Sequence, residues 1–225
     1  IIHNQYHTLM KLNDWYINRL KTMSAPEVVF RVSQFAQKKY EQRFRKGFNP
    51  PVELKRWPLS ILPIVNEPLN VSENNFEIFG IPFDYSGEIN WHQDIQTGNC
   101  FPLDFSKSIN VRKTEGISAK IVWEVNRLQF LSLIALRYRN CKDEKFIQLF
   151  KSIVESWIDN NPYLVGINWY SNIEVNLRLI TFFLSWEILD INRICKIDKE
   201  FHDFVVNKLI PAIYLHCQYS YQNTS

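Results

Sequence analysis

The chain has 225 residues, of which 46% are hydrophobic and 15% aromatic, while only six are glycine. This composition is typical of a folded globular chain and excludes a disordered one, and no glycine-rich phosphate-binding motif is present. With 26 basic and 23 acidic residues the formal net charge is +3, without the clustered lysines and arginines of a nucleic-acid surface. We therefore expect a globular protein of one large helical domain, or of a domain and a half, with no nucleic-acid partner.

The N-terminal part of the chain predicts two helices that form an antiparallel pair. Residues 4–21 repeat large apolar side chains at three- and four-residue steps, which predicts an amphipathic helix. The run Ser24-Ala25-Pro26-Glu27 has the pattern of a capping box with proline in the first turn, so a second helix begins there and extends to about Arg45. Residues 31–46 are rich in basic and aromatic residues, and we interpret them as a solvated helix face.

The next segment predicts irregular structure around one short hairpin. Proline recurs from Gly47 to Pro68 among large apolar residues, which indicates an extended wrap over the surface. Residues 76–85 predict a short hairpin or two irregular strands, with Pro82 restricting them to a sheet edge. Residues 86–118 predict a long loop that carries chemically active side chains. These are Trp91, His92, Asp94, Asp104 and Arg112.

From residue 119 onward the pattern changes to long helices separated by short turns. We expect helices at residues 119–139, 143–160, 171–190 and 198–220, which is how stacked antiparallel helix pairs look in sequence. The chain would then divide into residues 1–118, with the helix pair, wrap and hairpin, and residues 119–225, with helical repeats. The longest apolar run, LITFFLSW, is too short to span a membrane, so we expect no membrane span.

Two of these apolar helices begin with an unusual set of polar side chains. The first carries Trp123, Glu124, Asn126 and Arg127 in its opening turns, and the second is preceded or opened by Asn168, Trp169, Glu174 and Arg178. Glu174 and Arg178 are four residues apart and share one helix face. These groups either form structural ion pairs, Glu124 with Arg127 and Glu174 with Arg178, or they face a polar ligand.

Three segments in this order resemble a known family. The series WEVNRLQFLSLIALRYR, SIVESWIDNNP and GINWYSNIEVNLRLITFFLSWEIL is similar to the N-terminal helical domain of the heparinase II/III-like polysaccharide lyases, in particular to relatives encoded among bacterial cell-surface polysaccharide genes. The resemblance is strongest over residues 119–190 and lies in the series, not in a single catalytic motif. It implies an all-α fold: part of an (α/α) toroid of antiparallel helix pairs, with the hairpin as a small insertion.

The resemblance also implies a ligand and a location. In such a toroid the inner helices line a cleft that holds an acidic, uronate-containing polysaccharide, and it suits a periplasmic or secreted protein. Arginine suits uronate carboxylates, glutamate and asparagine suit hydroxyls, and tryptophan stacks on sugar faces. The expected substrate-binding residues are Trp123, Glu124, Arg127, Asn168, Trp169, Glu174 and Arg178.

Catalytic residues are not expected within these 225 residues. The family cleaves by β-elimination next to a uronic acid, and its asparagine-histidine pair and catalytic tyrosine follow later in the chain than the part matched here. No such pair follows the last predicted helix, so we expect the catalytic residues in a further C-terminal portion of the same protein. We predict that this chain alone is inactive.

The remaining histidines and cysteines give no metal or cofactor signal. His3 and His7 have a four-residue spacing but no carboxylate or third ligand, and His92 on the loop is the histidine of most interest. We interpret His202 and His216 as residues on the face of the last predicted helix. The four cysteines lie far apart, which favours buried free thiols over a zinc site or disulfides. We expect no metal and no cofactor.

Three functions stay open from the sequence. The first is the helical, groove-forming portion of a lyase that cleaves an acidic polysaccharide. The second is a carbohydrate-binding module that holds an acidic glycan without cleaving it. The third is a helical scaffold that binds another protein.

Overall fold

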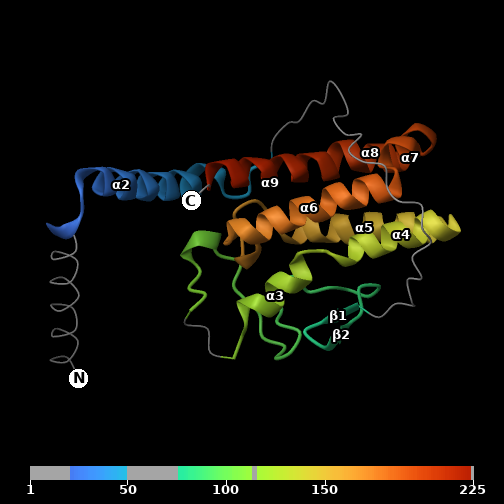
Figure 1. The fold of residues 1–225 in the computed structure, drawn as a ribbon, viewed down its shortest axis with the longest axis horizontal. Coiled ribbons are helices and arrows are strands. Elements are labelled where there is room, and N and C mark those ends of the chain that lie inside the picture. Colours follow the sequence, from blue (N-terminus) through green and yellow to red (C-terminus); the bar gives the residue numbers. More distant parts are fainter. Residues whose placement is uncertain (1–20, 50–75, 113–115, 224–225) are drawn as a thin grey trace. The chain divides into compact units, whose positions relative to one another are not determined.

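The computed structural model describes residues 21–49, 76–112 and 116–223 (Figure 1). The chain divides into two compact units, residues 1–44 and 45–225, which are described separately. The helix predicted for residues 4–21, apart from its last residue, and most of the proline-rich wrap lie outside the described residues. The antiparallel pairing of the first two helices therefore stays a prediction.

The first unit contains helix α2, Ala25–Tyr40, which continues as the π-helical turn η1, Glu41–Arg45, across the boundary into the second unit. Pro26 lies in the first turn, where its missing N–H costs no helical hydrogen bond. The predicted capping box is wrong, because the Ser24 side chain makes no capping hydrogen bond. The Glu27 carboxylate instead accepts from Arg31, one turn further along the helix, at 3.1 Å.

The predicted hairpin is confirmed. Strands β1, Phe76–Ile78, and β2, Ile81–Phe83, pair antiparallel, and the turn residues Phe79 and Gly80 have φ angles of 52° and 78°. Two consecutive left-handed residues match the twist of a two-residue hairpin turn. The buried side chains of the hairpin pack on Phe130, whose ring lies 5.6 Å from that of Phe83.

The helix predicted over residues 119–139 is two helices. Helix α3 spans Ala119–Asn126 and α4 spans Phe130–Cys141, with Leu128 between them at a φ of 59°. The side chain of Leu128 is fully buried, so core packing holds the backbone in a conformation that leucine otherwise avoids. No glycine or proline marks this break in the sequence, which is why a single helix was expected.

The remaining helices follow the prediction more closely. Helix α5 spans Lys145–Asn160 and stops before Asn161 and Pro162; a 3₁₀ turn η3, Ile167–Trp169, then leads into α6, Asn172–Leu189. The helix predicted at 198–220 is a continuous run of α8, Lys199–Phe204, the π-helical η4, Val205–Leu209, and α9, Ile210–Gln222. The short helix α7, Ile191–Ile197, was not predicted.

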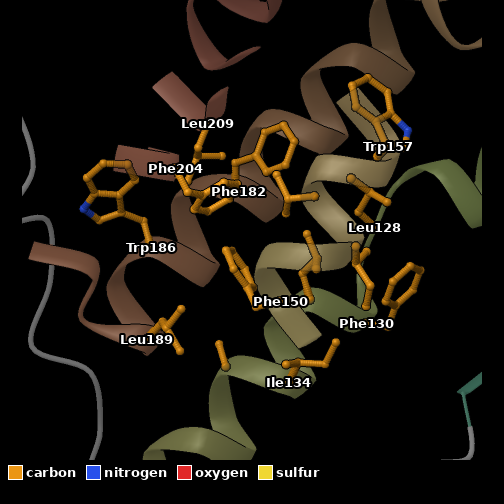
Figure 2. Packing of buried hydrophobic residues seen from close by; sticks show 14 of the residues in the cluster. Leu128, Phe130, Ile134, Phe150, Trp157, Phe182, Trp186, Leu189, Phe204 and Leu209 are labelled. Carbon is orange, nitrogen blue, oxygen red and sulfur yellow. The ribbon is translucent and has the colours of Figure 1, made fainter. Parts of the chain in front are cut away.

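Helix α6 lies between α4 and α9 in the second unit, and α5 packs on α4 (Figure 1). Cross-helix contacts give the directions. Arg178 contacts His216, and Asn176 contacts Ser220 further along α9, so α6 and α9 are antiparallel. Large apolar side chains from α4, α5, α6 and the C-terminal helices fill the core between them (Figure 2).

The described residues are mostly helical and include a small two-stranded sheet, which confirms the all-α prediction and its β insertion. The arrangement as part of a toroid stays a prediction, as does the division at residue 118. In the ranges that the structure covers, no helix has the length and hydropathy to cross a membrane.

Candidate functional site

The break after α3 brings charged and aromatic residues of α3 and of the start of α6 together. Arg127 donates from Nε and Nη2 to the two carboxylate oxygens of Glu174, at 2.8 and 3.0 Å, and from Nη1 to Glu124. The hydrogen bonds to Glu174 raise the pKa of Arg127, so the guanidinium is charged throughout the working range. The side chains of Arg127 and Glu124 are 25% and 18% exposed, which leaves one edge of this group open to solvent.

An aromatic pair lies one helical turn before these ions. Trp123 precedes Arg127 by four residues on α3, and Tyr170 precedes Glu174 by four, so the two pairs face each other across the same junction. The rings of Trp123 and Tyr170 are near parallel, 24° apart, with centroids separated by 6.2 Å. The indole N–H of Trp123 donates to the carbonyl of Ile167 at 3.0 Å, which fixes the ring against η3. We call Trp123, Tyr170, Glu124, Arg127 and Glu174 the α3–α6 cluster.

Arg178, one turn further along α6, is fully buried. Its Nε donates to Nε2 of His216 at 3.0 Å, and its other nitrogens donate to the carbonyls of Asn168 and Asn126 at 2.5 and 3.4 Å. The guanidinium carbon lies 4.9 Å from the ring centre of Trp157. Burial lowers the pKa of Arg178 to about 9, so the side chain keeps its charge at neutral pH.

The predicted ion pair of Glu174 with Arg178 is therefore wrong, whereas that of Glu124 with Arg127 is confirmed. Glu174 lies across the helix junction from Arg127 and accepts two hydrogen bonds from it, with its own side chain only 6% exposed. Arg178 is surrounded by carbonyls, an imidazole and indole faces instead of a carboxylate.

His216 is an interior residue, which corrects its assignment to a helix face. Its Nδ1 lies 2.7 Å from the carbonyl of Ala212, so Nδ1 carries the proton and Nε2 is free to accept from Arg178. Burial, and second the charge of Arg178, lowers the pKa of His216 well below its usual value. Arg178 and His216 are 38 positions apart, so no local sequence pattern could have indicated this contact.

Buried asparagines connect the Arg178 environment to the 86–112 loop. Asn126 and Asn168 both donate to the carbonyl of Trp91, at 2.8 and 3.0 Å, and Asn168 also donates to Asn161. The indole N–H of Trp157 donates to Asn126 at 2.9 Å. These groups hydrogen-bond or stack on one another in the interior, and among them only Asn168 Oδ1 is a buried side-chain atom without a hydrogen-bond partner. We name Arg178, His216, the three asparagines and the indoles of Trp157 and Trp169 the Arg178 network.

The seven residues expected to bind substrate thus fall into two groups. Trp123, Glu124, Arg127 and Glu174 meet in the α3–α6 cluster at or just below the surface. Asn168, Trp169 and Arg178 belong to the interior network, where none is more than 1% exposed. Tyr170, which completes the cluster, was missed because a lone tyrosine before a helix start has no distinctive pattern.

The 86–112 loop is irregular, as predicted, and its histidine lies inside the fold. His92 Nε2 lies 2.9 Å from the carbonyl of Asn160, and burial lowers the pKa of His92. Gly166 closes over this ring: at its φ of 76°, an added Cβ would lie 2.6 Å from Cε1 of His92. Only glycine fits there.

All four cysteines are free thiols, but the prediction that they are buried is wrong. Cys100, Cys141 and Cys217 are exposed and Cys195 is half-buried, with its pKa raised to about 11 by partial burial. Among the described residues no three histidine, cysteine or acidic side chains come together as a metal site would require.

The packed helices α4, α5, α6 and α9, with a polar and aromatic junction between α3 and the start of α6, define a helical domain. The family model for the heparinase II/III N-terminus matches residues 15–224. The chain therefore belongs to this family, and it is a domain related to polysaccharide lyases. No curated protein and no solved structure matches it.

Proposed function

We propose that this chain forms part of the substrate groove of a lyase that cleaves an acidic polysaccharide by β-elimination. The family match over residues 15–224 is the observation that carries the proposal. Among the described residues, the α3–α6 cluster has the chemistry to contact sugars, because the partly exposed Arg127 and Glu124 adjoin an aromatic pair there.

The cluster combines three kinds of sugar contact. The ring face of Trp123 stacks on the apolar face of a sugar, and the carboxylate of Glu124 accepts hydrogen bonds from hydroxyls. Arg127 is held by two carboxylates, so the three ions carry a formal charge of −1 (one positive, two negative). A uronate carboxylate binds by replacing Glu124 at Nη1 of Arg127, while Glu174 keeps the guanidinium in place.

The buried residues contribute indirectly. Asn168 bonds η3 to the 86–112 loop, Trp169 bonds it to Asn161, and Arg178 bonds it to α6. The same turn carries the carbonyl that fixes Trp123. We assign them a positioning role in the same subsite. We assign no catalytic residue, and the elimination chemistry belongs to a further portion of the same protein.

The binding test uses alginate and heparan sulfate as acidic probes and dextran as a neutral one, measured by calorimetry on the full 225-residue chain. Arg127→Ala is expected to weaken binding of the acidic polymers about ten- to a hundredfold, because a charged hydrogen bond contributes about 1.5–3 kcal/mol. Glu124→Gln is expected to strengthen it, since a competing and repelling carboxylate is removed.

Arg193→Ala is the matched control, because Arg193 is also an ion-paired arginine, bound to Asp190 at 3.1 Å and about half exposed. Equal losses in Arg127→Ala and Arg193→Ala would show nonspecific charge attraction and remove the cluster from the proposal. The chain alone is expected to form no unsaturated uronate, which is followed by its ultraviolet absorbance.

A protein-binding scaffold is the second candidate, and one surface favours it. Ile173, Ile180 and Leu184 lie along one face of α6 and are 70%, 54% and 51% exposed. Concentration-dependent self-association in light scattering, abolished by Ile180→Glu and unaffected by polysaccharide, would favour the scaffold over the lyase groove.

A further inference from the structure

Among the described residues, α2 and its continuation η1 expose more large apolar side chains than any other helix or strand. Six of these side chains are between 54% and 68% exposed, and no side chain of α2 is buried. They are Val29, Phe30, Val32, Phe35, Tyr40 and Phe44. Single apolar residues are normal on a protein surface, whereas several on one helix mark a surface that contacts an apolar partner or medium.

The polar residues of α2 and η1 follow one stripe, and the apolar side chains occupy the rest of the helix surface. The stripe consists of Glu27, Arg31, Gln34, Lys38, Glu41 and Arg45, at alternating steps of four and three residues. The apolar arc is wide, because Phe30 and Val32 lie about 200° apart around the helix axis. One antiparallel helix covers only a strip of such an arc, so pairing with residues 4–21 would leave apolar surface uncovered.

The positive charge of the chain is concentrated on the same segment. Residues 25–46 contain six basic and two acidic residues, a net charge of +4, whereas the whole chain carries +3, so the remainder carries −1. Five of the six basic residues lie between positions 38 and 46. The Nζ atom of Lys39 lies 5.8 Å from the ring centre of Phe35, so its aliphatic part runs along the apolar arc and its charge lies at the edge. A solvated face accounts for the polar stripe but not for this combination of exposed apolar and basic groups.

We propose that α2 and η1 lie in the surface of a membrane that contains anionic lipid. The apolar arc enters the boundary between headgroups and acyl chains, and the basic residues contact lipid phosphates. A lipid surface offers both an apolar medium and negative charge, whereas an acidic polysaccharide or a nucleic acid offers mainly charge. The helix lies on the membrane and does not span it. This proposal does not depend on the proposed function, since it involves neither the α3–α6 cluster nor polysaccharide.

The test is cosedimentation of the full 225-residue chain with lipid vesicles. Vesicles of phosphatidylcholine with phosphatidylglycerol are compared with vesicles of phosphatidylcholine alone. We expect binding at least about tenfold stronger to the anionic vesicles, and weaker binding at high salt, because salt screens the attraction between exposed charges. Hydrogen exchange followed by mass spectrometry should show slower exchange in residues 25–45 on the anionic vesicles and no change in α6.

The charged part of the proposal is tested by Lys38→Ala combined with Lys39→Ala. We expect vesicle binding to weaken about twentyfold, because each basic residue near an anionic surface contributes about a factor of five. Lys196→Ala combined with Lys199→Ala is the matched control, because both of these lysines are exposed and lie outside α2. The control is expected to bind as the wild type does.

The apolar part is tested by Val32→Glu combined with Phe35→Glu, which should abolish vesicle binding. Both side chains are more than half exposed, so the fold is expected to survive, which circular dichroism checks. Leu103→Glu combined with Ile197→Glu is the matched control, since these apolar side chains are 58% and 74% exposed on other segments. Retained vesicle binding in Val32→Glu with Phe35→Glu would show charge attraction alone and overturn the proposal.

Two further results would overturn the proposal. Equal binding to neutral and anionic vesicles would remove the role of the basic residues. If the wild type sediments with neither kind of vesicle, the apolar arc has another partner, which analytical ultracentrifugation identifies. A dimer that Val32→Glu with Phe35→Glu dissociates would assign the arc to a second copy of the chain, and a monomer would assign it to another part of the same chain.

Discussion

Arg127 and Arg178 lie in closely similar sequence settings, each near the start of an apolar helix with a tryptophan and a glutamate close by, yet their surroundings are opposite. Arg127 is partly exposed and neutralised by two carboxylates. Arg178 is fully buried and held by two carbonyls, an imidazole and indole faces. The difference teaches that the residue types at a helix start do not decide between a ligand site and an interior support; the partners from distant segments do.

The largest expected effect comes from removing the buried arginine. Arg178→Ala should lower the free energy of unfolding by about 3–5 kcal/mol, because it leaves the acceptors of the Arg178 network unpaired and opens a cavity. Urea unfolding followed by circular dichroism measures this loss. A change below about 1 kcal/mol would mean that Arg178 does not stabilise the interior. The two arginines would then not differ in their structural role.

The next largest expected effect is a pH dependence of the free energy of unfolding, which comes from buried histidines. The pKa of His216 is lowered in the folded state, so the unfolded chain binds a proton more readily below about pH 6.5. Stability that is present above that pH is therefore lost as the pH falls, by up to about 1.4 kcal/mol per pH unit for one proton. His92, whose pKa is also lowered, adds to the same trend.

His216→Gln isolates the contribution of His216. Urea midpoints of the wild type and the variant are compared between pH 7 and pH 4.5, with His202→Gln as a control on an exposed histidine of the preceding helix. The variant should show a shallower fall in stability than the wild type. If stability fell equally steeply with pH in the variant and in the wild type, His216 would not be the source of the acid sensitivity.

The smallest expected effect on the free energy of unfolding is that of a substitution in the partly exposed α3–α6 cluster. Arg127→Ala should cost about 1–3 kcal/mol, since its pair with Glu124 is partly exposed and screened, whereas Glu174, 6% exposed, loses the donor of its two hydrogen bonds. The same urea assay at 0.05 and 0.5 M salt tests this, because salt should reduce the difference further. A loss comparable to that of Arg178→Ala would show that the cluster, too, is mainly structural.

The sequence indicated the helices and the hairpin where local rules decide them. Phe79 and Gly80 turn the hairpin between alternating apolar residues, and Asn161 and Pro162 end α5. It did not indicate the break at Leu128, because there the packing of one buried side chain outweighs the local preference for a continuous helix. Nor did it indicate α7, whose seven residues are too few for a periodic pattern.

The residue types of the candidate site could be predicted from the sequence, but most of their hydrogen-bond partners could not. Sequence spacing correctly joined Glu124 to Arg127, three residues apart on one helix. It assigned Glu174 to Arg178 by the same reasoning, whereas the structure joins Glu174 to an arginine 47 residues away. Long-range partners such as Arg127, His216 and the Trp91 carbonyl are fixed by tertiary packing, which a spacing rule does not contain.

The glycine at 166 also matters for mutational screening. It lies directly before η3, and any side chain there would collide with His92 and push aside the turn that carries both Trp169 and the carbonyl that holds Trp123. A library selected for loss of sugar binding would therefore return residue 166 as a strong hit, although Gly166 is not part of the α3–α6 cluster. A folding assay on each selected variant is therefore needed to separate residues that contact the sugar from residues that support the fold.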